Sequence, residues 1–552
     1  MLKDGTIWVA NDGEGAPLTI RPEMANRHGL ITGATGTGKT VTVKVLAESF
    51  SDLGVPVFLA DVKGDLAGMI RPGADSEDMR ARISRFGLEE DFSYQSFPAS
   101  FWDIYGVSGI QLRTTVSEIG PLLLSRVLDL NDLQSDILSI IFKIADDQQL
   151  LLVDTKDLKA MLHYVDENRE EFAPAYGKIS PASIGAITRA LVALETAGGD
   201  IFFGEPALNI ADWLTTDAEG KGMIHILDSG SLINNPRLYS TFLLWLMSEL
   251  FETLPEVGDL AKPKMVFFFD EAHLLFNDAP KPLLDKIEQV VKLIRSKGVG
   301  VYFCTQNPKD IPDGVLAQLG NKIQHALRAY TPAEQKAIRA AAESFRPNPD
   351  FDTFEAITTL GTGEAVVSFL DEEGIPSVAE KGFILPPRSL MGSIDESARD
   401  TAVKSSLAYS KYAVAYDPDS AYEFLERKGL ADREAAEAAA EAERLKAEEK
   451  AAKEAEKEAA RAAKEEEKAA VAAAKAEERE AAKAAAAAAK AEEKARKQKE
   501  RAVKQVGNSV AGTVGREVGK QFGKQFGSFG KTLGGNVGAS IGRGLLSTLF
   551  KR

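Results

Sequence analysis

The fold of this chain is decided by the stretch Gly33-Ala34-Thr35-Gly36-Thr37-Gly38-Lys39-Thr40. It matches the P-loop pattern G-x-x-x-x-G-K-[ST] at every fixed position. Residues 28–32 before it are typical of a short buried strand, and residues 41–48 after it are typical of a helix. This strand–loop–helix context is what a working P-loop requires. A glycine-rich turn with a chance Lys-Thr pair is the alternative, and the flanks disfavour it.

The loop predicts a site for a nucleotide and Mg²⁺. Its glycines let successive backbone N–H groups turn inward around phosphates, so we expect residues 33–41, Val41 included, to bind the nucleotide. Lys39 places a positive charge against the β- and γ-phosphates. Thr40 offers its hydroxyl to Mg²⁺, and the helix N-terminus adds a partial positive charge.

Composition limits the class of protein. At 552 residues the chain is too long for one hydrophobic core and suggests two or three domains. A formal net charge of −16 argues against a protein that coats DNA through a uniformly basic surface. The single cysteine, Cys304, suits a reducing compartment, and residues 1–5 lack the apolar core of a signal peptide. With no run of about 20 apolar residues, we expect a cytoplasmic protein without a membrane-spanning helix.

A second strand supplies the acids that P-loop chemistry needs. The run 264–269 is apolar and ends at Asp270 and Glu271. We expect Asp270 to hold the Mg²⁺ and Glu271 to orient and deprotonate the attacking water. The following His273 completes an Asp-Glu-Ala-His sequence, but the other motifs of the helicase class with that name are not present downstream. That class is therefore rejected.

Two more strand ends carry polar side chains. The strand 300–305 ends at Gln306, whose amide could hydrogen-bond the γ-phosphate or the attacking water; a simple polar cap is the alternative. The strand 55–60 ends at Asp61, followed by Lys63 and Asp65. These residues could face the magnesium site or serve only a turn, since parallel strands present their carboxyl ends at the ligand-binding edge.

Apolar strands alternate with helices, which predicts an α/β fold with a mostly parallel sheet covered on both faces. Helical spacing dominates the region 75–220, which we interpret as an insertion. The expected divisions are a small β cap at 1–27, a P-loop NTPase core at 28–74 and 221–390, the helical insertion at 75–220, a peripheral linker at 391–430, a long helix at 431–503 and a glycine-rich tail at 504–552.

The last two divisions differ from the core in composition. Residues 431–503 are almost entirely Ala, Glu, Lys and Arg, typical of a solvated helix of roughly 110 Å, with an Ala-seamed coiled coil as the alternative. In the tail, eight basic residues oppose one acid, Glu517, and glycines recur near every fourth position. Self-association, an anionic membrane surface, nucleic acid and disorder all remain open for this tail.

The P-loop, the strand ending at Asp270 and Glu271, the turn at 295–298 and the strand end at 305–308 occur in an order that resembles the HerA/FtsK superfamily of P-loop ATPases. The runs 61–65 and 203–206 resemble the bacterial HerA-helicase-like family. This resemblance covers about residues 1–430. It implies a RecA-like core, ATP as the nucleotide, a hexameric ring and an arginine donated to the neighbouring subunit's site, for which Arg328 and Arg295 are the candidates.

Two main functional hypotheses follow. The first is a ring-forming, Mg²⁺-dependent ATPase motor, a helicase or translocase acting on double-stranded DNA. The second is an ATPase that does not act on DNA and is tethered to a membrane surface or a protein assembly through its C-terminal helix and tail. A nucleotide-binding structural protein is a weaker third hypothesis, because Glu271 beside Asp270 favours hydrolysis.

Overall fold

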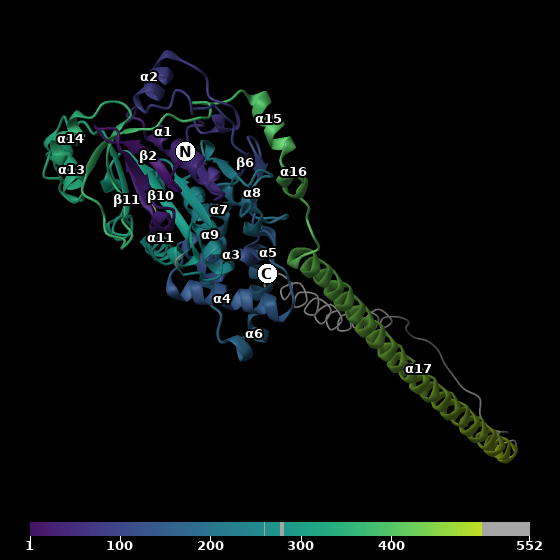
Figure 1. The fold of residues 1–552 in the computed structure, drawn as a ribbon. Helices are drawn as coiled ribbons and strands as arrows, with labels where there is room; N and C mark the ends of the chain where they lie inside the picture. The colour runs from purple at the N-terminus through teal and green to yellow at the C-terminus, as the bar shows by residue number, and fades with distance from the viewer. Residues whose placement is uncertain (259, 277–280, 499–552) are drawn as a thin grey trace, which may run out of the picture. The chain divides into compact units, whose positions relative to one another are not determined.

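The computed structural model describes residues 1–258, 260–276 and 281–498, and its first compact unit spans residues 1–437. A 13-stranded sheet forms the centre of this unit (Figure 1). Eight neighbouring strands of the sheet run parallel. In spatial order they are β11 (Asn321–His325), β4 (Gly29–Thr32), β10 (Val299–Thr305), β9 (Met265–Phe269), β5 (Val57–Asp61), β8 (Ile224–Asp228), β6 (Ala99–Asp103) and β7 (Ile110–Gln111).

Helices cover both faces of the parallel strands. The connection through α1 (Lys39–Asp52) runs from β4 to β5, whereas those through α9 (Pro236–Thr253) and α11 (Lys281–Ile294) step in the opposite direction along the sheet. Right-handed crossovers of opposite direction place their helices on opposite faces. Aromatic contacts agree, because Phe268 packs on Phe50 of α1 while Phe58 packs on Phe242 of α9. The predicted fold class is confirmed.

The N-terminal strands are not a separate cap, which corrects the expectation for residues 1–27. Strand β2 (Thr6–Asn11) pairs with β13 (Glu380–Ile384) and extends the main sheet. Five strands form this antiparallel side. They are β12 (Glu364–Ser368), which pairs with β11, then β13, β2, β1 (Leu2–Lys3) and β3 (Pro17–Ile20). The pairing could not be inferred locally, since β2 and β13 are more than 360 residues apart.

The expected helical insertion at 75–220 contains the predicted helices but also two strands of the main sheet. Strands β6 and β7 continue the parallel order beyond β8, so this expectation is wrong in that respect. Strand β6 has only five residues, both polar and apolar, and so short a segment is not recognisable as a strand within a region of helical spacing. The helices of the region are α2 (Glu77–Arg85), α3 (Val116–Val127), α4 (Asp132–Asp147), α5 (Thr155–Glu167), α6 (Arg169–Tyr176), α7 (Pro181–Thr196) and α8 (Gly199–Phe202).

The expected linker 391–430 is largely helical. It contains α15 (Glu396–Ser405), which contacts β6, and α16 (Leu407–Tyr412), which contacts β7. Arg399 of α15 pairs with Asp228 at the end of β8, with 2.7 Å between Nη1 and Oδ2. This segment is therefore part of the first unit, because its contacts extend across the sheet edge.

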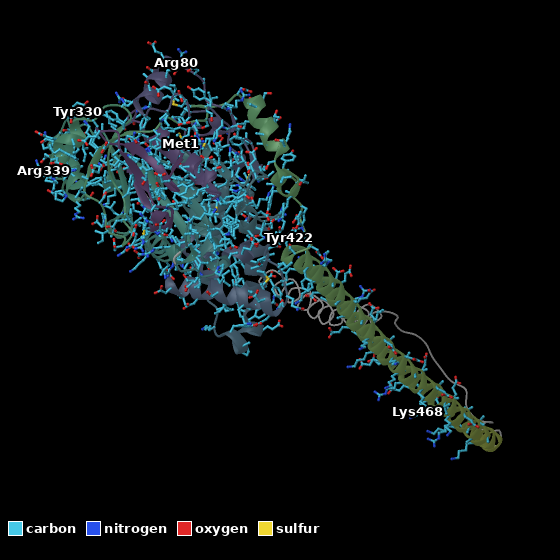
Figure 2. The ribbon with its side chains drawn as sticks, in the orientation of Figure 1. Met1, Arg80, Tyr330, Arg339, Tyr422 and Lys468 are labelled. Carbon is cyan, nitrogen blue, oxygen red and sulfur yellow. The ribbon has the colours of Figure 1, made fainter. Side chains whose placement is uncertain are left out.

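The predicted long helix exists and begins earlier than expected. Helix α17 runs Ala421–Gln498, and its side chains from Glu426 to Ala491 are exposed, Lys468 among them (Figure 2). The second compact unit begins at Ala438. The glycine-rich tail lies outside the described residues. Among the helices of the described part, none is long and apolar enough to cross a membrane.

Candidate active site

Sheet register brings the predicted motifs to one edge. Thr305 at the end of β10 is paired with Thr32 at the end of β4, and Phe303 is paired with Phe269 at the end of β9. The residues that follow these strand ends therefore leave the sheet side by side. They are the P-loop after β4, Gln306 after β10, and Asp270 with Glu271 after β9.

The P-loop is shaped by glycines and braced by β11. Gly33, Gly36 and Gly38 have φ values of +156°, +78° and +115°, and residues that carry a Cβ rarely adopt positive φ. A Cβ at Gly33 would lie 2.5 Å from the Cβ of His325 on β11. The main chain is also fixed across this contact, because the Ala34 N–H donates to the Ala326 carbonyl over 2.8 Å. The loop therefore tolerates glycine alone at its first position.

His325 supports the loop and was not identified from the sequence. Its Nε2 lies 2.8 Å from the Thr42 hydroxyl of α1, and its Nδ1 lies 2.9 Å from the Glu364 carbonyl oxygen. Burial lowers the pKa of His325 to about 4, so the ring is neutral at physiological pH. Only the pairing of β11 with β4 brings the residue to the loop, which explains why the local sequence carried no signal.

The loop and the start of α1 suit a triphosphate. Helix α1 begins at Lys39. The residue before it, Gly38, has no side chain that could accept hydrogen bonds from the N–H groups of the first turn. The first N–H groups of α1 can therefore bind an anion. The buried Lys39 ammonium donates to the carbonyl oxygens of Gly33 and Ala34 over 2.6 and 3.1 Å. These loop carbonyls hold the cation where phosphates would meet it.

The acid pair is buried at the end of β9. The exposed fractions of Asp270 and Glu271 are 6% and 4%. Burial, followed by the charge of Glu271, raises the pKa of Asp270. At Glu271 the backbone turns into the left-handed region with φ +47°, a conformation that costs a non-glycine residue about 1 kcal/mol.

Three side-chain nitrogen atoms lie close to the Glu271 carboxylate. Lys63 Nζ lies 2.5 Å from Oε1, while Gln306 Nε2 and His273 Nδ1 lie 3.3 and 3.4 Å from Oε2. Burial opposes ionisation of Glu271, but its contacts with Lys63 and Gln306 bring its pKa below the usual value. The carboxylate is thus kept ionised, as a general base must be.

Asp61 has a structural role that the sequence left open. Its carboxylate accepts hydrogen bonds from the N–H groups of Gly64 and Leu66 over 2.8 and 3.0 Å, and so it shapes the loop that carries Lys63. Burial raises the pKa of Asp61 to about 6, and the charge of Asp270 adds to the rise. Its contribution to the site is therefore to position Lys63.

A cleft of about 430 Å³ opens beside the P-loop. Arg328 lines it with Ala34 and Thr35, and its guanidinium donates to the carbonyl oxygens of Thr358 and Leu360. Gln306 and His273 line the same cleft, so it adjoins the acid pair. Arg328 thus lies in the cleft of its own chain's P-loop.

Arg295, the other candidate arginine, does not line this cleft. It belongs to a short 3-10 turn, Arg295–Lys297, immediately before β10. Gln306 follows the other end of that strand, and a strand of seven residues spans about 23 Å. The structure therefore separates Arg295 from the cleft of its own chain.

The oxygen atoms of the P-loop threonine and of the acid after β9 fit a magnesium–nucleotide complex. Within residues 1–258, 260–276 and 281–498, no group of three His, Cys, Asp or Glu side chains could hold a metal ion. Mg²⁺ at nucleotide sites is bound instead by one or two protein oxygens together with phosphates and water. The hydroxyl of Thr40 and the carboxylate of Asp270 are the residues that would hold it.

This arrangement of P-loop, buried acid pair and strand-end amide defines a P-loop ATPase. The chain belongs to the helicase HerA-like C-terminal family, which matches residues 7–536. It is 21% identical over 373 residues to the DNA double-strand break repair helicase HerA of Sulfurisphaera tokodaii, covering 66% of this chain and 67% of that protein. It is 35% identical over 120 residues to a probable helicase of Methanocaldococcus jannaschii, covering 21% of each chain.

Solved structures are also similar at low identity. The bacterial conjugative coupling protein TrwB, lacking its first 70 residues, gives a TM-score of 0.49 at 14% identity, covering 71% of this chain and 92% of that one. VirB4 of Thermoanaerobacter pseudethanolicus gives a TM-score of 0.43 at 16% identity, covering 70% and 97%.

Proposed function

We propose that the chain is an ATP- and Mg²⁺-dependent motor that assembles as a homo-hexameric ring and translocates along double-stranded DNA. One observation carries the catalytic part of this proposal. A buried Glu271, in contact with Lys63 and Gln306, lies beside Asp270 at the same sheet edge as the P-loop. Membership of the HerA-like family supports the motor part, since relatives carry the name DNA double-strand break repair helicase.

Each side chain has a step in the proposed reaction. Lys39 and the N-terminus of α1 bind the β- and γ-phosphates, and Thr40 and Asp270 hold the magnesium–water shell. Glu271 takes a proton from the attacking water, while Gln306 orients that water or the γ-phosphate. Arg328 stabilises charge on the transferring phosphoryl group from within the cleft.

The test measures ATP hydrolysis by the full chain with no DNA, with linear double-stranded DNA and with single-stranded DNA, alongside its mass in solution. We expect double-stranded DNA to stimulate hydrolysis and ATP to favour a hexamer. Lys39→Ala and Glu271→Gln should abolish the stimulated rate. Hydrolysis that no form of DNA stimulates would contradict the DNA part of the proposal.

The alternative, tethering to an anionic membrane surface or a protein assembly, is favoured by a separate observation. The side chains of α17 are exposed from Glu426 to Ala491, and the basic tail follows this helix in sequence. Flotation with anionic phospholipid vesicles, comparing the full chain with a chain ending at Glu437, tests it. Tethering would be supported if the full chain floats with the vesicles and the shortened chain does not. Equal flotation of both chains would exclude the tail from this role.

A further inference from the structure

A second cavity lies on another side of the P-loop helix. It has a volume of about 230 Å³ and is lined by Thr40, Val41, Lys44, Asp65, Met391 and Gly392. The first three of these residues share one face of α1, because positions three and four apart in a helix are neighbours. None of the six lines the cleft that contains Gln306 and Arg328.

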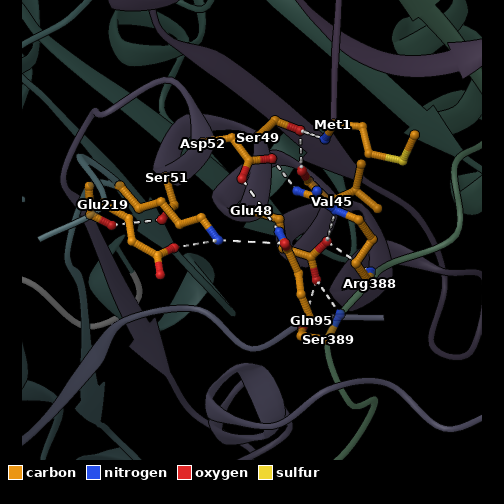
Figure 3. A network of polar contacts seen from close by, with 12 residues as sticks. Met1, Val45, Glu48, Ser49, Ser51, Asp52, Gln95, Glu219, Arg388 and Ser389 are labelled. Carbon is orange, nitrogen blue, oxygen red and sulfur yellow. Dashed lines mark hydrogen bonds and ion pairs between the residues drawn. The ribbon is translucent and has the colours of Figure 1, made fainter. Parts of the chain in front are cut away.

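The far wall of this cavity is a strap, residues 388–392, which is fixed to α1. The carboxylate of Glu48, 1% exposed, accepts from the N–H groups of Arg388 and Ser389 over 2.9 and 3.0 Å (Figure 3). The Ser389 hydroxyl donates to the same carboxylate over 2.6 Å. One turn nearer the P-loop, the buried Lys44 ammonium donates to the Leu390 carbonyl oxygen. The strap therefore cannot shift without breaking buried polar contacts.

The strap is also fixed on its other side. The Leu390 N–H donates to the Arg71 carbonyl over 2.9 Å, and the Gly68 N–H donates to the Gly392 carbonyl over 3.1 Å. A Cβ at Gly68 would lie 2.3 Å from the Leu390 carbonyl oxygen, so this close approach requires glycine. Between these anchors, Met391 lines the cavity and is 52% exposed.

A nucleotide bound at the P-loop would extend from the cleft that contains Gln306 toward the second cavity. For Glu271 to act on the attacking water, the γ-phosphate must point toward the cleft that contains Gln306. The α-phosphate and nucleoside then leave the loop in the other direction, past the first turn of α1. Thr40 and Val41 border the second cavity at this turn.

We propose that the cavity between α1 and the strap is the nucleoside subsite, with Met391 against the base and Asp65 accepting hydrogen bonds from the ribose hydroxyls. This inference rests on the proposed ATPase site. Lys44 is a positioning residue, since it holds Leu390 and thereby the wall that carries Met391. The polarisable thioether of Met391 suits contact with a purine ring.

The test compares ATP with inorganic tripolyphosphate, which has the phosphates but no nucleoside. Binding of each is measured by calorimetry in Mg²⁺ with the full chain. Met391→Ala should weaken ATP binding about tenfold through lost apolar contact and leave tripolyphosphate binding within about twofold. Leu407→Ala is the matched control, because Leu407 is 94% exposed and does not line this cavity. Leu407→Ala should change neither the binding of ATP nor the binding of tripolyphosphate.

A second variant tests the ribose contact. Asp65→Ala should weaken binding of ATP and leave binding of 2′,3′-dideoxy-ATP unchanged. An equal loss for both nucleotides would overturn the ribose contact. For Met391→Ala, an unchanged ATP affinity, or an equal loss for ATP and tripolyphosphate, would overturn the subsite. If the unmodified chain binds neither ligand, the proposed nucleotide site itself fails, which is distinguishable from a failure of the subsite alone.

Discussion

Lys63 Nζ lies 2.5 Å from Glu271 Oε1, so the proposed general base is half of an ion pair between the ends of two neighbouring strands. The two residues are 208 positions apart in the sequence. Lys63 is 43% exposed, whereas the Glu271 side chain is 6% exposed. The lysine therefore brings a solvent-accessible charge to a carboxylate that burial would otherwise push toward its neutral form.

The first prediction concerns the pH dependence of hydrolysis. Glu271 must be ionised to accept a proton, and its contacts with Lys63 help to lower its pKa against the effect of burial. In Lys63→Met the pKa of Glu271 should rise, so the acidic limb of the kcat profile should move to higher pH. The loss of rate should then be larger at pH 6 than at pH 8. Lys63→Arg keeps the charge and is the matched control; an equal loss at every pH would contradict this role.

A second prediction separates the two arginines. Arg328 lines the cleft beside the P-loop, and Arg295 precedes the opposite end of β10. Arg328→Ala should lower kcat about 100-fold, the usual cost of losing one group that stabilises transition-state charge. Arg295→Ala should stay within about twofold, because Arg295 lies away from the cleft of its own chain. Steady-state hydrolysis with saturating ATP measures both, and a large loss for Arg295→Ala alone would reverse the assignment.

A third prediction concerns stability and pH. The buried ring of His225 accepts a hydrogen bond at Nδ1 from Trp102 Nε1 over 3.2 Å, and its Nε2 lies 3.1 Å from the Trp213 carbonyl oxygen. Burial lowers the pKa of His225 to about 4. Between pH 6.5 and 4 the unfolded chain binds a proton that the folded chain does not bind. This residue should therefore lower the free energy of unfolding by about 3 kcal/mol across that window as pH falls.

Chemical denaturation at pH 7 and pH 5, with His225→Gln as the comparison, measures this effect. The variant should be less stable than the unmodified chain at pH 7, and it should lose less stability on going to pH 5. Parallel losses in the two proteins would show that His225 does not titrate as described.

A fourth prediction concerns the second compact unit. The side chains from Ala438 to Ala491 are exposed, and the buried core of the described residues lies before them. A chain ending at Glu437 should therefore keep the Tm of the full chain within about 2 °C and retain DNA-independent ATP hydrolysis. Calorimetric scans of both chains check this, and a large drop in Tm would show that the helix supports the core.

Much of the site could be predicted from the sequence because its signals are local. The P-loop, the apolar strand ending at Asp270 and Glu271, and the strand ending at Gln306 are each contiguous. Parallel order alone then places them at one edge. The contacts between distant segments could not be predicted. His325 reaches the P-loop only through the β11–β4 pairing, and the contact of Glu48 with Ser389 spans 341 positions.

The central claim is that the P-loop and the acid pair act on one Mg²⁺–ATP complex. The most direct test measures ATP binding and single-turnover hydrolysis by the unmodified chain, Lys39→Ala and Glu271→Gln. We predict that Glu271→Gln binds ATP normally and hydrolyses it at least about 100-fold more slowly, while Lys39→Ala loses binding. Hydrolysis by Glu271→Gln at the unmodified rate would contradict the claim.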